Sequence, residues 1–527
     1  MFDILIKNGT VIDGSDSPRA RLDVGITGGK ITAVDNLAGA EAGHVIDAAG
    51  LVVAPGFIDI HSHADYSLLA LPTADSKTRQ GVTTEVVGNC GISTAPLSPA
   101  MQLKGDANSL LGAFGLSWDW DTFASFYDRL RASGTAVNVV PLVGHGTIRE
   151  KNMGMSDKAP TPEQFAAMQA DVREAMRDGA WGISTGLIYP PNVYARTDEI
   201  ADLAKTAAEL GGIYTSHVRG EGATVFEAVG EAIEVGRRAG IRVEVSHFKA
   251  ENRANWYKMR PLVDMIEAAQ ERGVNVKADM YPYNAFCTVL SSMMPPWSMA
   301  GGKEAALARL KDPAVRKEIA KGLASDALDG EPGYWEGVMI TYATGRPEYQ
   351  GRSVRSISDE QHKSPEDAFM DILLESSLDA GVVVFAMDED NIEYGLARPY
   401  VSIGSDGEGR AAEGPLSKSM PHPRNYGTFP RVLGYYCRER KVFPLETAVY
   451  KMTGLQAEKL GLKDRGLVRA GCFADLTLFN PDTVIDKATF SQPHQYPEGI
   501  EYVLVNGSLV IENGKHTRAL PGKVLAR

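Results

Sequence analysis

Short apolar runs alternate with amphipathic stretches through the middle of the chain. Runs that end in polar or turn-forming residues are typical of buried parallel strands, and the stretches between them have helical periodicity. Eight strands with helices between them are the number that closes a (β/α)8 TIM-like barrel, an α/β fold. The eight segments are 56–61, 83–88, 136–144, 181–186, 212–217, 241–247, 275–281 and 400–406. A ninth candidate strand at 381–389 leaves the count open.

One of the intervening helices can be checked against its own sequence. Thr161 is a favourable N-cap, and Pro162 suits the first helical position because its missing N–H needs no partner there. Apolar side chains then recur at steps of three or four residues, at Phe165, Met168, Val172 and Met176. This stripe favours packing against the barrel over a role in cofactor binding.

The two ends of the chain share a different pattern. Residues 1–54 consist of short alternating runs separated by turn signals such as Asn8-Gly9, and 474–480 and 501–515 resume that pattern around Asn506-Gly507. We therefore expect one small β-sandwich domain, built from residues 1–54 and 456–527, beside a barrel of residues 55–455. Within the barrel, residues 285–346 break the alternation and are rich in Pro, Gly, Met and Trp. This segment is predicted to be an insertion that acts as a lid over the barrel mouth.

Composition narrows the classes of partner. The 527 residues carry a formal net charge of -13, which argues against nucleic acid or an anionic membrane as the main partner. No uncharged stretch reaches the roughly 20 residues of a membrane span, and no secretory signal is visible. Four widely spaced cysteines (Cys90, Cys287, Cys437 and Cys472) do not resemble a disulfide framework. We expect a cytoplasmic protein with a small-molecule substrate; a homo-oligomer is compatible with the sequence.

The predicted strands end in residues that carry chemistry. In a barrel of this type the carboxyl ends of all strands form one concave face, where reactive residues gather. The first strand ends in His61 and His63, and because alternate residues share a side of a strand, both can point into the barrel. The ends of the second, third, fifth, sixth and eighth strands hold Cys90, His145, His217, His247 with Lys249, and Asp406. Imidazole, thiolate and carboxylate together suit zinc.

The short motifs at these strand ends occur together in a known group of proteins. "PGFIDIHSHAD", the two "SH" endings and "GSDG" resemble the amidohydrolase superfamily, and "GNCGIS", "STGLIYPP", "SHFKA" and "HPRNYGTFPRVLG" are similar to the D-aminoacylases, or N-acyl-D-amino-acid deacylases. The resemblance covers nearly the whole chain. It implies that Cys90, His217 and His247 hold one zinc ion tightly. It also implies that His61 and His63 belong to a second site that the family fills weakly.

The resemblance also implies roles for the remaining residues. Asp406 would be the general base and acid, accepting a proton from water and returning it to the departing amine. Tyr189 would donate a hydrogen bond to the developing oxyanion. Lys249, Tyr281 and Arg424 would bind the α-carboxylate of the amino acid. The stretch "GSDGEG" is followed by a longer gap before "HPRNYG" than the family pattern has, so Arg424 aligns less securely than Asp406.

The sequence offers less evidence about which substrates the protein prefers. Relatives that act on acidic D-amino acids need a cation for the side chain, and "FCTVLSSMMPPW" after "YPY" has no Lys or Arg. This favours neutral or apolar side chains. Two alternatives stay open: a cyclic-amide hydrolase such as a hydantoinase, which would need a lysine that bridges two metals, and a catalytically silent scaffold. The handedness of the substrate follows from the resemblance alone.

Overall fold

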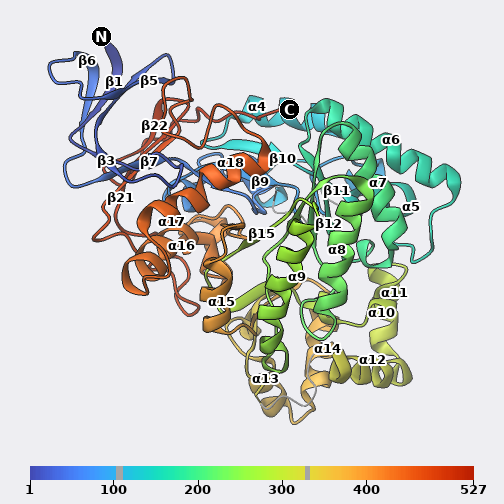
Figure 1. The fold of residues 1–527 in the computed structure, drawn as a ribbon. Helices are drawn as coiled ribbons and strands as arrows, with labels where there is room; N and C mark the ends of the chain where they lie inside the picture. Colours follow the sequence, from blue (N-terminus) through green and yellow to red (C-terminus); the bar gives the residue numbers. More distant parts are fainter. Residues whose placement is uncertain (103–110, 327–332) are drawn as a thin grey trace.

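A computed structural model of the chain describes residues 1–102, 111–326 and 333–527. Its centre is the predicted barrel: eight strand positions follow one another in chain order, with parallel pairing along each run (Figure 1). The third strand is split in two at Leu142. The barrel strands are β8 (Phe57–Asp59), β9 (Val82–Val87), β10 (Asn138–Pro141), β11 (Val143–Gly144), β12 (Gly182–Gly186), β13 (Ile213–His217), β14 (Arg242–Val245), β15 (Val276–Met280) and β19 (Val401–Ile403).

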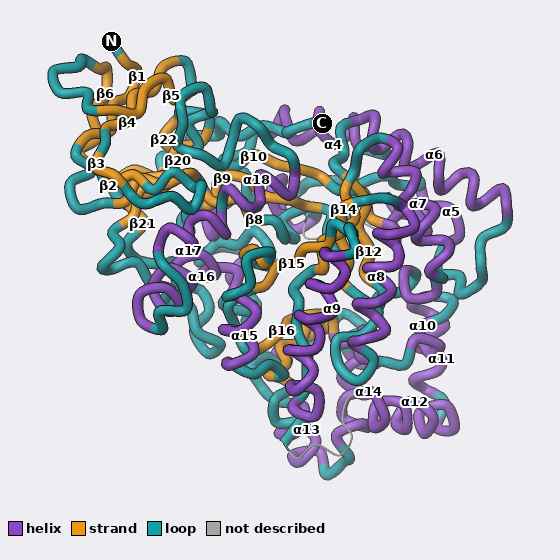
Figure 2. The backbone as a smooth tube through the Cα atoms, in the orientation of Figure 1, coloured by secondary structure: helices purple, strands orange, loops and turns teal. Residues whose placement is uncertain are grey.

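Helices cover the outside of the barrel, as Figure 2 shows for α5 to α9 beside the orange strands. The predicted helix is α6 (Pro162–Asp178), and it is confirmed in detail. The Thr161 side chain accepts from Gln164 N–H at the N-terminus, and Met168, Val172 and Met176 are buried. The other helices along the barrel are α1 (Ser67–Ala70), α2 (Asp75–Thr78), α4 (Phe123–Ser133), α5 (His145–Met153), α7 (Thr197–Glu209), α8 (Val225–Ala239), α9 (Met259–Glu271), α16 (Arg424–Arg431), the π-helix Val432–Glu439, α17 (Leu445–Met452) and α18 (Gly454–Leu460).

Two further sheets lie at one end of the molecule (Figure 1); the N-terminal end of the chain builds one of them, and both ends share the other. One sheet has the order β5 (Lys30–Asp35), β4 (Asp23–Thr27), β1 (Phe2–Lys7) and β6 (Ala42–Asp47). The other has the order β23 (Lys515–His516), β22 (Ser508–Glu512), β21 (Ile500–Val505), β20 (Leu476–Phe479), β7 (Val52–Pro55), β2 (Thr10–Val11) and β3 (Ala20–Arg21). Antiparallel pairing of β20 with β7 joins the two ends of the chain directly.

A shared core holds these two sheets together. Ile26 and Ile46 from the first sheet pack in one buried cluster with Val53, Leu476 and Leu504 from the second. Such packing of apolar faces is what makes two sheets a stable sandwich. The last residues of the chain leave this domain and run beside β10, where Val524 bridges Val139. The predicted limits at residues 54 and 456 stay predictions.

The chain between β15 and β19 forms a separate unit below the barrel in Figure 1. Its antiparallel sheet has the order β16 (Ala285–Val289), β18 (Ala380–Phe385), β17 (Val338–Ala343). The ninth candidate strand at 381–389 is therefore largely β18, and it belongs to this sheet rather than to the barrel. The unit's helices are α10 (Pro296–Met299), α11 (Lys303–Lys311), α12 (Pro313–Asp326), α13 (Val354–Gln361) and α14 (Pro365–Glu375). The next helix, α15 (Glu389–Leu396), packs against β15, β19 and α9 and so returns the chain to the barrel.

The segment predicted as a lid, 285–346, contains two strands of this sheet, β16 and β17. The third strand, β18, comes later in the chain. Residues 327–332 of that segment lie outside the described residues. In the described part of the chain, no helix is both long and apolar enough to cross a membrane.

Candidate active site

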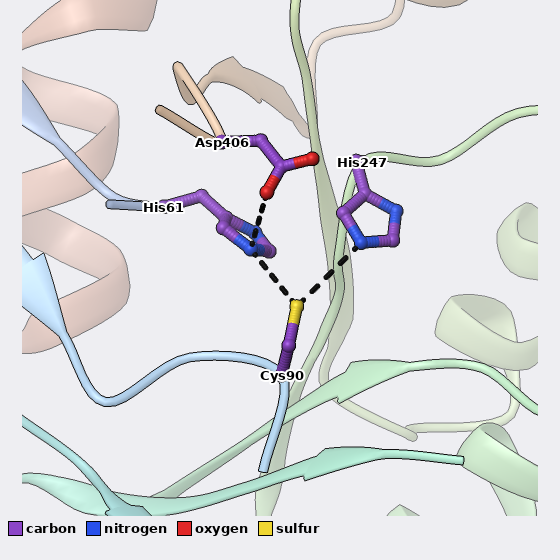
Figure 3. Close-up of side chains that lie close together, drawn as sticks. All are labelled: His61, Cys90, His247 and Asp406. Carbon is purple, nitrogen blue, oxygen red and sulfur yellow. Dashed lines mark hydrogen bonds and ion pairs between the residues drawn. The ribbon is translucent and has the colours of Figure 1, made fainter. Parts of the chain in front are cut away.

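The carboxyl ends of the barrel strands bring the predicted residues together. His61 follows β8, Cys90 follows β9, His247 follows β14 and Asp406 follows β19, and their side chains converge on one point in Figure 3. His217, the last residue of β13, reaches the same point. These five side chains come from five strands that are far apart in sequence, and all five are buried.

The sulfur atom of Cys90 lies at the centre of this group. Its Sγ is 3.3 Å from His61 Nε2, 3.7 Å from His247 Nε2 and 3.8 Å from His217 Nδ1. Two ligands of a tetrahedral zinc ion, a thiolate sulfur and an imidazole nitrogen, stand about 3.6 Å apart when the usual bond lengths are used. The donor set therefore fits zinc in both element type and spacing. His217 Nε2, in turn, is buried without a hydrogen-bond partner and has Glu221 Oε2 3.9 Å away.

A second set of donors overlaps the first. Asp406 Oδ1 lies 3.1 Å from His63 Nε2 and 3.5 Å from His61 Nε2. His63 is the more open of the two, since 26% of its side chain is exposed while His61 has none exposed. His61 thus stands between Cys90 on one side and Asp406 on the other, so the group offers ligands for one metal ion or for two.

The charges within the site favour ionised ligands. Burial alone would raise the pKa of the Cys90 thiol, but the positive charge of His61 and the hydrogen bonds from His217 and His247 lower it well below its usual value. A thiolate is the form that binds metals. For Asp406, burial is outweighed by the nearby guanidinium of Arg424, which holds the pKa of the carboxyl group well below its usual range. Asp406 is therefore an anion at neutral pH.

Three of the site residues have an unusual backbone. Cys90, His247 and Asp406 are non-glycine residues with positive φ angles of 53°, 35° and 50°. Each such residue costs on the order of 1–3 kcal/mol, a cost that proteins concentrate at functional sites. The next residue, Gly91, has a φ of 74° and packs so closely against Asn192 that a Cβ atom on it would lie 2.3 Å from Asn192 Oδ1. The strand ends turn sharply, and the turn aims the side chains into the barrel.

The predicted substrate-binding residues surround this centre. Arg424, at the start of α16, places Nη1 2.8 Å from Asp406 Oδ2 and donates from Nη2 to the Cys287 carbonyl at 3.1 Å. The guanidinium lies 5.0 Å from the ring of Tyr281, whose hydroxyl is buried without a hydrogen-bond partner. Arg424 thus lies at the site even though the sequence between "GSDGEG" and "HPRNYG" is longer than the family pattern.

Two other predicted residues already have partners. Lys249 donates to Glu221 Oε1 at 2.5 Å, and its Nζ is 2.8 Å from His247 Nδ1. The Tyr189 hydroxyl is 2.9 Å from Thr288 Oγ1, in β16 of the inserted unit. That contact places the inserted sheet against the site. His145, in contrast, lies apart from the cluster and contacts Asn192 and Glu199.

The structure adds two residues that the sequence analysis missed. Glu221 Oε1 is 2.9 Å from His247 Nδ1, and Asp279 Oδ1 is 3.3 Å from His61 Nδ1. Carboxylates that hold the second nitrogen of an imidazole fix its tautomer and its orientation toward a metal. Asp279 was detectable as a carboxylate near the end of the seventh strand. Glu221 lies in the loop after β13, where only its spacing of four residues from His217 gave a signal.

The comparisons with known proteins agree with this arrangement. A family model described as the amidohydrolase family matches residues 44–313 and 401–511. The chain belongs to the amidohydrolase family. This amidohydrolase is 40% identical to a D-aminoacylase of Alcaligenes xylosoxydans xylosoxydans over 526 residues, covering 100% of this chain and 98% of the relative. It is 39% identical to an N-acyl-D-aspartate deacylase of the same organism, covering 99% and 95%.

Two solved structures are similar to this amidohydrolase over 100% of both chains. One is a D-aminoacylase described by one-metal activation and second-metal attenuation at its binuclear metal centre, with a TM-score of 0.84 and 37% identity. The other is an N-acyl-D-glutamate deacylase from Bordetella bronchiseptica, in complex with zinc and a phosphonate that mimics the tetrahedral intermediate, with a TM-score of 0.83 and 35% identity. The predicted resemblance to the D-aminoacylases is confirmed.

Proposed function

We propose that this amidohydrolase hydrolyses the amide bond of N-acyl-D-amino acids with zinc, giving a carboxylate and a free D-amino acid. The observation that carries the proposal is Cys90 Sγ within 3.8 Å of three imidazole nitrogens at the barrel mouth, beside the Asp406–Arg424 ion pair. The relatives named above act on N-acyl-D-amino acids by their names, which supports the substrate class.

In this proposal Cys90, His217 and His247 hold the tightly bound zinc ion, and His61 and His63 serve a weaker second site. Zinc would supply Lewis-acid polarisation of the amide carbonyl and would lower the pKa of water to about 7. The protein would supply an anionic, buried set of ligands whose orientation is fixed by Glu221 and Asp279.

Asp406 would move the proton. Its Oδ1 faces the histidine pair and its Oδ2 faces Arg424, so the carboxylate is held between the metal ligands and the substrate-binding side. As the water oxygen bonds to the acyl carbon, Asp406 accepts the proton that the water loses. It then donates that proton to the amine nitrogen as the C–N bond breaks, which restores the carboxylate. Tyr189 would donate a hydrogen bond from its hydroxyl group to the developing oxyanion in place of its present contact with Thr288.

Arg424, Lys249 and Tyr281 would bind the α-carboxylate of the substrate. A buried carboxylate needs positive partners. Arg424 and Lys249 lie 5.0 Å and 5.7 Å from the centre of the Tyr281 ring, and the Tyr281 hydroxyl is buried without a hydrogen-bond partner. Arg410, four residues after Asp406, is already paired with Glu408, with Nη2 2.5 Å from Oε2, so we do not assign it to the substrate. We propose neutral or apolar side chains as the preferred substrates, because β16 borders the site and residues 286–297 contain no cation.

The same site would accept small peptides with a D-residue at the C-terminus. We place the protein in the cytoplasm, because its four cysteines are all free and the proposed ligand Cys90 must stay reduced. A cyclic-amide hydrolase is less well supported, since solved structures of two D-hydantoinases, one of them from Thermus sp., share only 15% and 17% identity with this chain and show the fold alone.

The experiment that tests the function is amine release from matched N-acetyl-D- and N-acetyl-L-amino acids, with enzyme stripped of metal and then titrated with zinc. We expect zinc to restore hydrolysis of the D-substrates only, and the stoichiometry at the maximal rate counts the working metal ions. Hydrolysis of L-substrates or of cyclic amides would refute the substrate class. Bound zinc without any turnover would refute the activity.

A further inference from the structure

The barrel has a seam where its first and eighth strands meet. In the described chain, no strand ladder joins β8 to β19, and the only bridge between their extensions pairs Ser62 with Gly407. Yet this seam carries His61 and His63 on one side and Asp406 on the other. The separation between the histidine pair and Asp406 is therefore set by contacts other than a regular sheet.

Two backbone hydrogen bonds cross the seam near the site. Asp406 N–H donates to the His61 carbonyl at 2.7 Å, and His63 N–H donates to the Gly407 carbonyl at 2.9 Å. Side chains provide the remaining contacts. Asp59 Oδ1 accepts from Ser405 N–H at 2.8 Å, and Asp59 Oδ2 accepts from Ser405 Oγ at 2.5 Å. Asp59 lies two residues before His61, and Ser405 lies directly before Asp406.

A buried ammonium group joins these contacts. Lys77, in α2, is fully buried, and its Nζ donates to Asp59 Oδ2 at 2.8 Å, to Ser405 Oγ at 2.9 Å and to the Gly407 carbonyl at 3.0 Å. It thus contacts the first strand and both residues that flank Asp406. Burying such a charge is costly, and the cost is met only where the partners are close and well oriented.

We propose that Lys77, acting through Asp59 and Ser405, is a positioning residue that holds Asp406 at its working distance from the histidine pair. Asp406 has a positive φ of 50°, a backbone conformation that costs free energy for a residue with a Cβ, so contacts on both sides are needed to hold it. Lys77 fixes that conformation from both sides, through Ser405 Oγ before Asp406 and the Gly407 carbonyl after it. The proposal rests on the proposed function, in which Asp406 moves the proton.

The structure offers a matched control in Lys451. This lysine is also buried, and it donates to the carbonyls of Arg398 and Val401, at the opposite end of β19. Replacing Lys451 removes a buried lysine that holds the same strand, but it leaves the seam intact. Lys77→Met leaves Asp59 and the neighbouring Glu85 buried without their cation, so Ser405→Ala serves as a milder second variant.

The test compares zinc-loaded wild type, Lys77→Met, Ser405→Ala and Lys451→Met on an N-acetyl-D-amino acid. Misplacing a catalytic group by about 1 Å costs about 100-fold. We expect kcat to fall about 100-fold for Lys77→Met and about tenfold for Ser405→Ala, with KM within about twofold and zinc content unchanged. Lys451→Met should keep kcat within about twofold of the wild type, even if its thermal stability falls as far as that of Lys77→Met.

Crystal structures of the wild type and of Ser405→Ala or Lys77→Met provide a readout that does not depend on turnover. The distance between Asp406 Oδ1 and His63 Nε2, 3.1 Å here, should increase in the variants. An unchanged distance, an unchanged kcat in Ser405→Ala, or an equal kcat loss in Lys451→Met would overturn the proposal. If the wild type has no turnover, the proposed function fails, and the crystallographic comparison still decides whether Lys77 positions Asp406.

Discussion

Arg424 Nη1 lies 2.8 Å from Asp406 Oδ2, and less than a tenth of either side chain is exposed. This pair joins the proposed base to a proposed substrate-binding cation. It also means that the protonation of Asp406 depends on Arg424, because the guanidinium is the largest influence lowering the pKa of this carboxyl group against the effect of burial.

Arg424→Met should therefore change the pH profile as well as the rate. Without the guanidinium the pKa of Asp406 rises, and since hydrolysis needs the ionised carboxylate, the acid limb of kcat/KM should move to higher pH. KM should also increase, because the substrate carboxylate loses a cation. Measurement of kcat/KM from pH 4 to pH 9 checks both effects. Arg431→Met, on the same helix but paired with Asp486, is the control, and an unshifted acid limb would contradict the prediction.

Cys90→Ser should remove the tightly bound zinc ion. A hydroxyl group stays protonated where the thiol ionises, so the central ligand of the cluster loses its charge. We expect zinc affinity to fall by at least about 100-fold, the upper end of the range for loss of an outer ligand partner. Metal analysis after dialysis measures this. Cys472→Ser replaces a buried cysteine in the β domain and should keep its zinc.

Glu221→Gln should weaken the same site less severely. The amide keeps the shape of the side chain but removes the charge beside His247 Nδ1, and it releases Lys249 from its ion pair. We expect a loss of about 10- to 100-fold in zinc affinity or activity. Glu231→Gln, which breaks a pair with Arg219 outside the cluster, is the matched control. Equal zinc affinity in both variants would argue that Glu221 does not orient His247.

Side-chain preference can be measured directly. N-acetyl-D-methionine and N-acetyl-D-leucine should be hydrolysed with a higher kcat/KM than N-acetyl-D-glutamate, because residues 286–297 offer no cation to a second carboxylate. A preference for glutamate would show that a cation from another element reaches the side chain.

Stability should depend on the protonation of Lys451. Burial, together with nearby Lys459, lowers the pKa of Lys451 to about 7, whereas an unfolded lysine has a pKa of about 10.4. Between these values the unfolded chain binds more protons, so the contribution of Lys451 to the free energy of unfolding rises with pH from about 7 to about 10 and is flat below. The difference in unfolding free energy between wild type and Lys451→Met should rise over this interval in urea titrations. A constant difference would contradict the low pKa.

The sequence was informative about the barrel because each strand left a local signal. An apolar run followed by His61 and His63, or by Asp406, identifies both a strand and its carboxyl end. The same signal could not separate β18 from the barrel strands, because an apolar run looks alike in either sheet. Only the pairing of β18 with β16 and β17 assigns it to the inserted unit.

Contacts between distant segments left no comparable signal. Lys77 resembles any lysine of a short polar helix, and its contact with Ser405 joins residues 328 positions apart. The positive φ angles of Cys90, His247 and Asp406 were equally hidden, because these residue types adopt ordinary strand angles elsewhere. The sequence predicted which side chains meet at the barrel mouth, but it did not predict the contacts that orient them.

The inserted unit interrupts the barrel between β15 and β19, and the family match stops at residue 313 and resumes at residue 401. The proposed metal ligands all lie within the matched residues, and so does β16, the first strand of the unit, which contacts Tyr189 and Arg424. Evolution could therefore exchange this module without disturbing the metal chemistry. A chimaera that carries the inserted unit of an acid-specific relative should change the side-chain preference of the enzyme while keeping its metal ligands and Asp406.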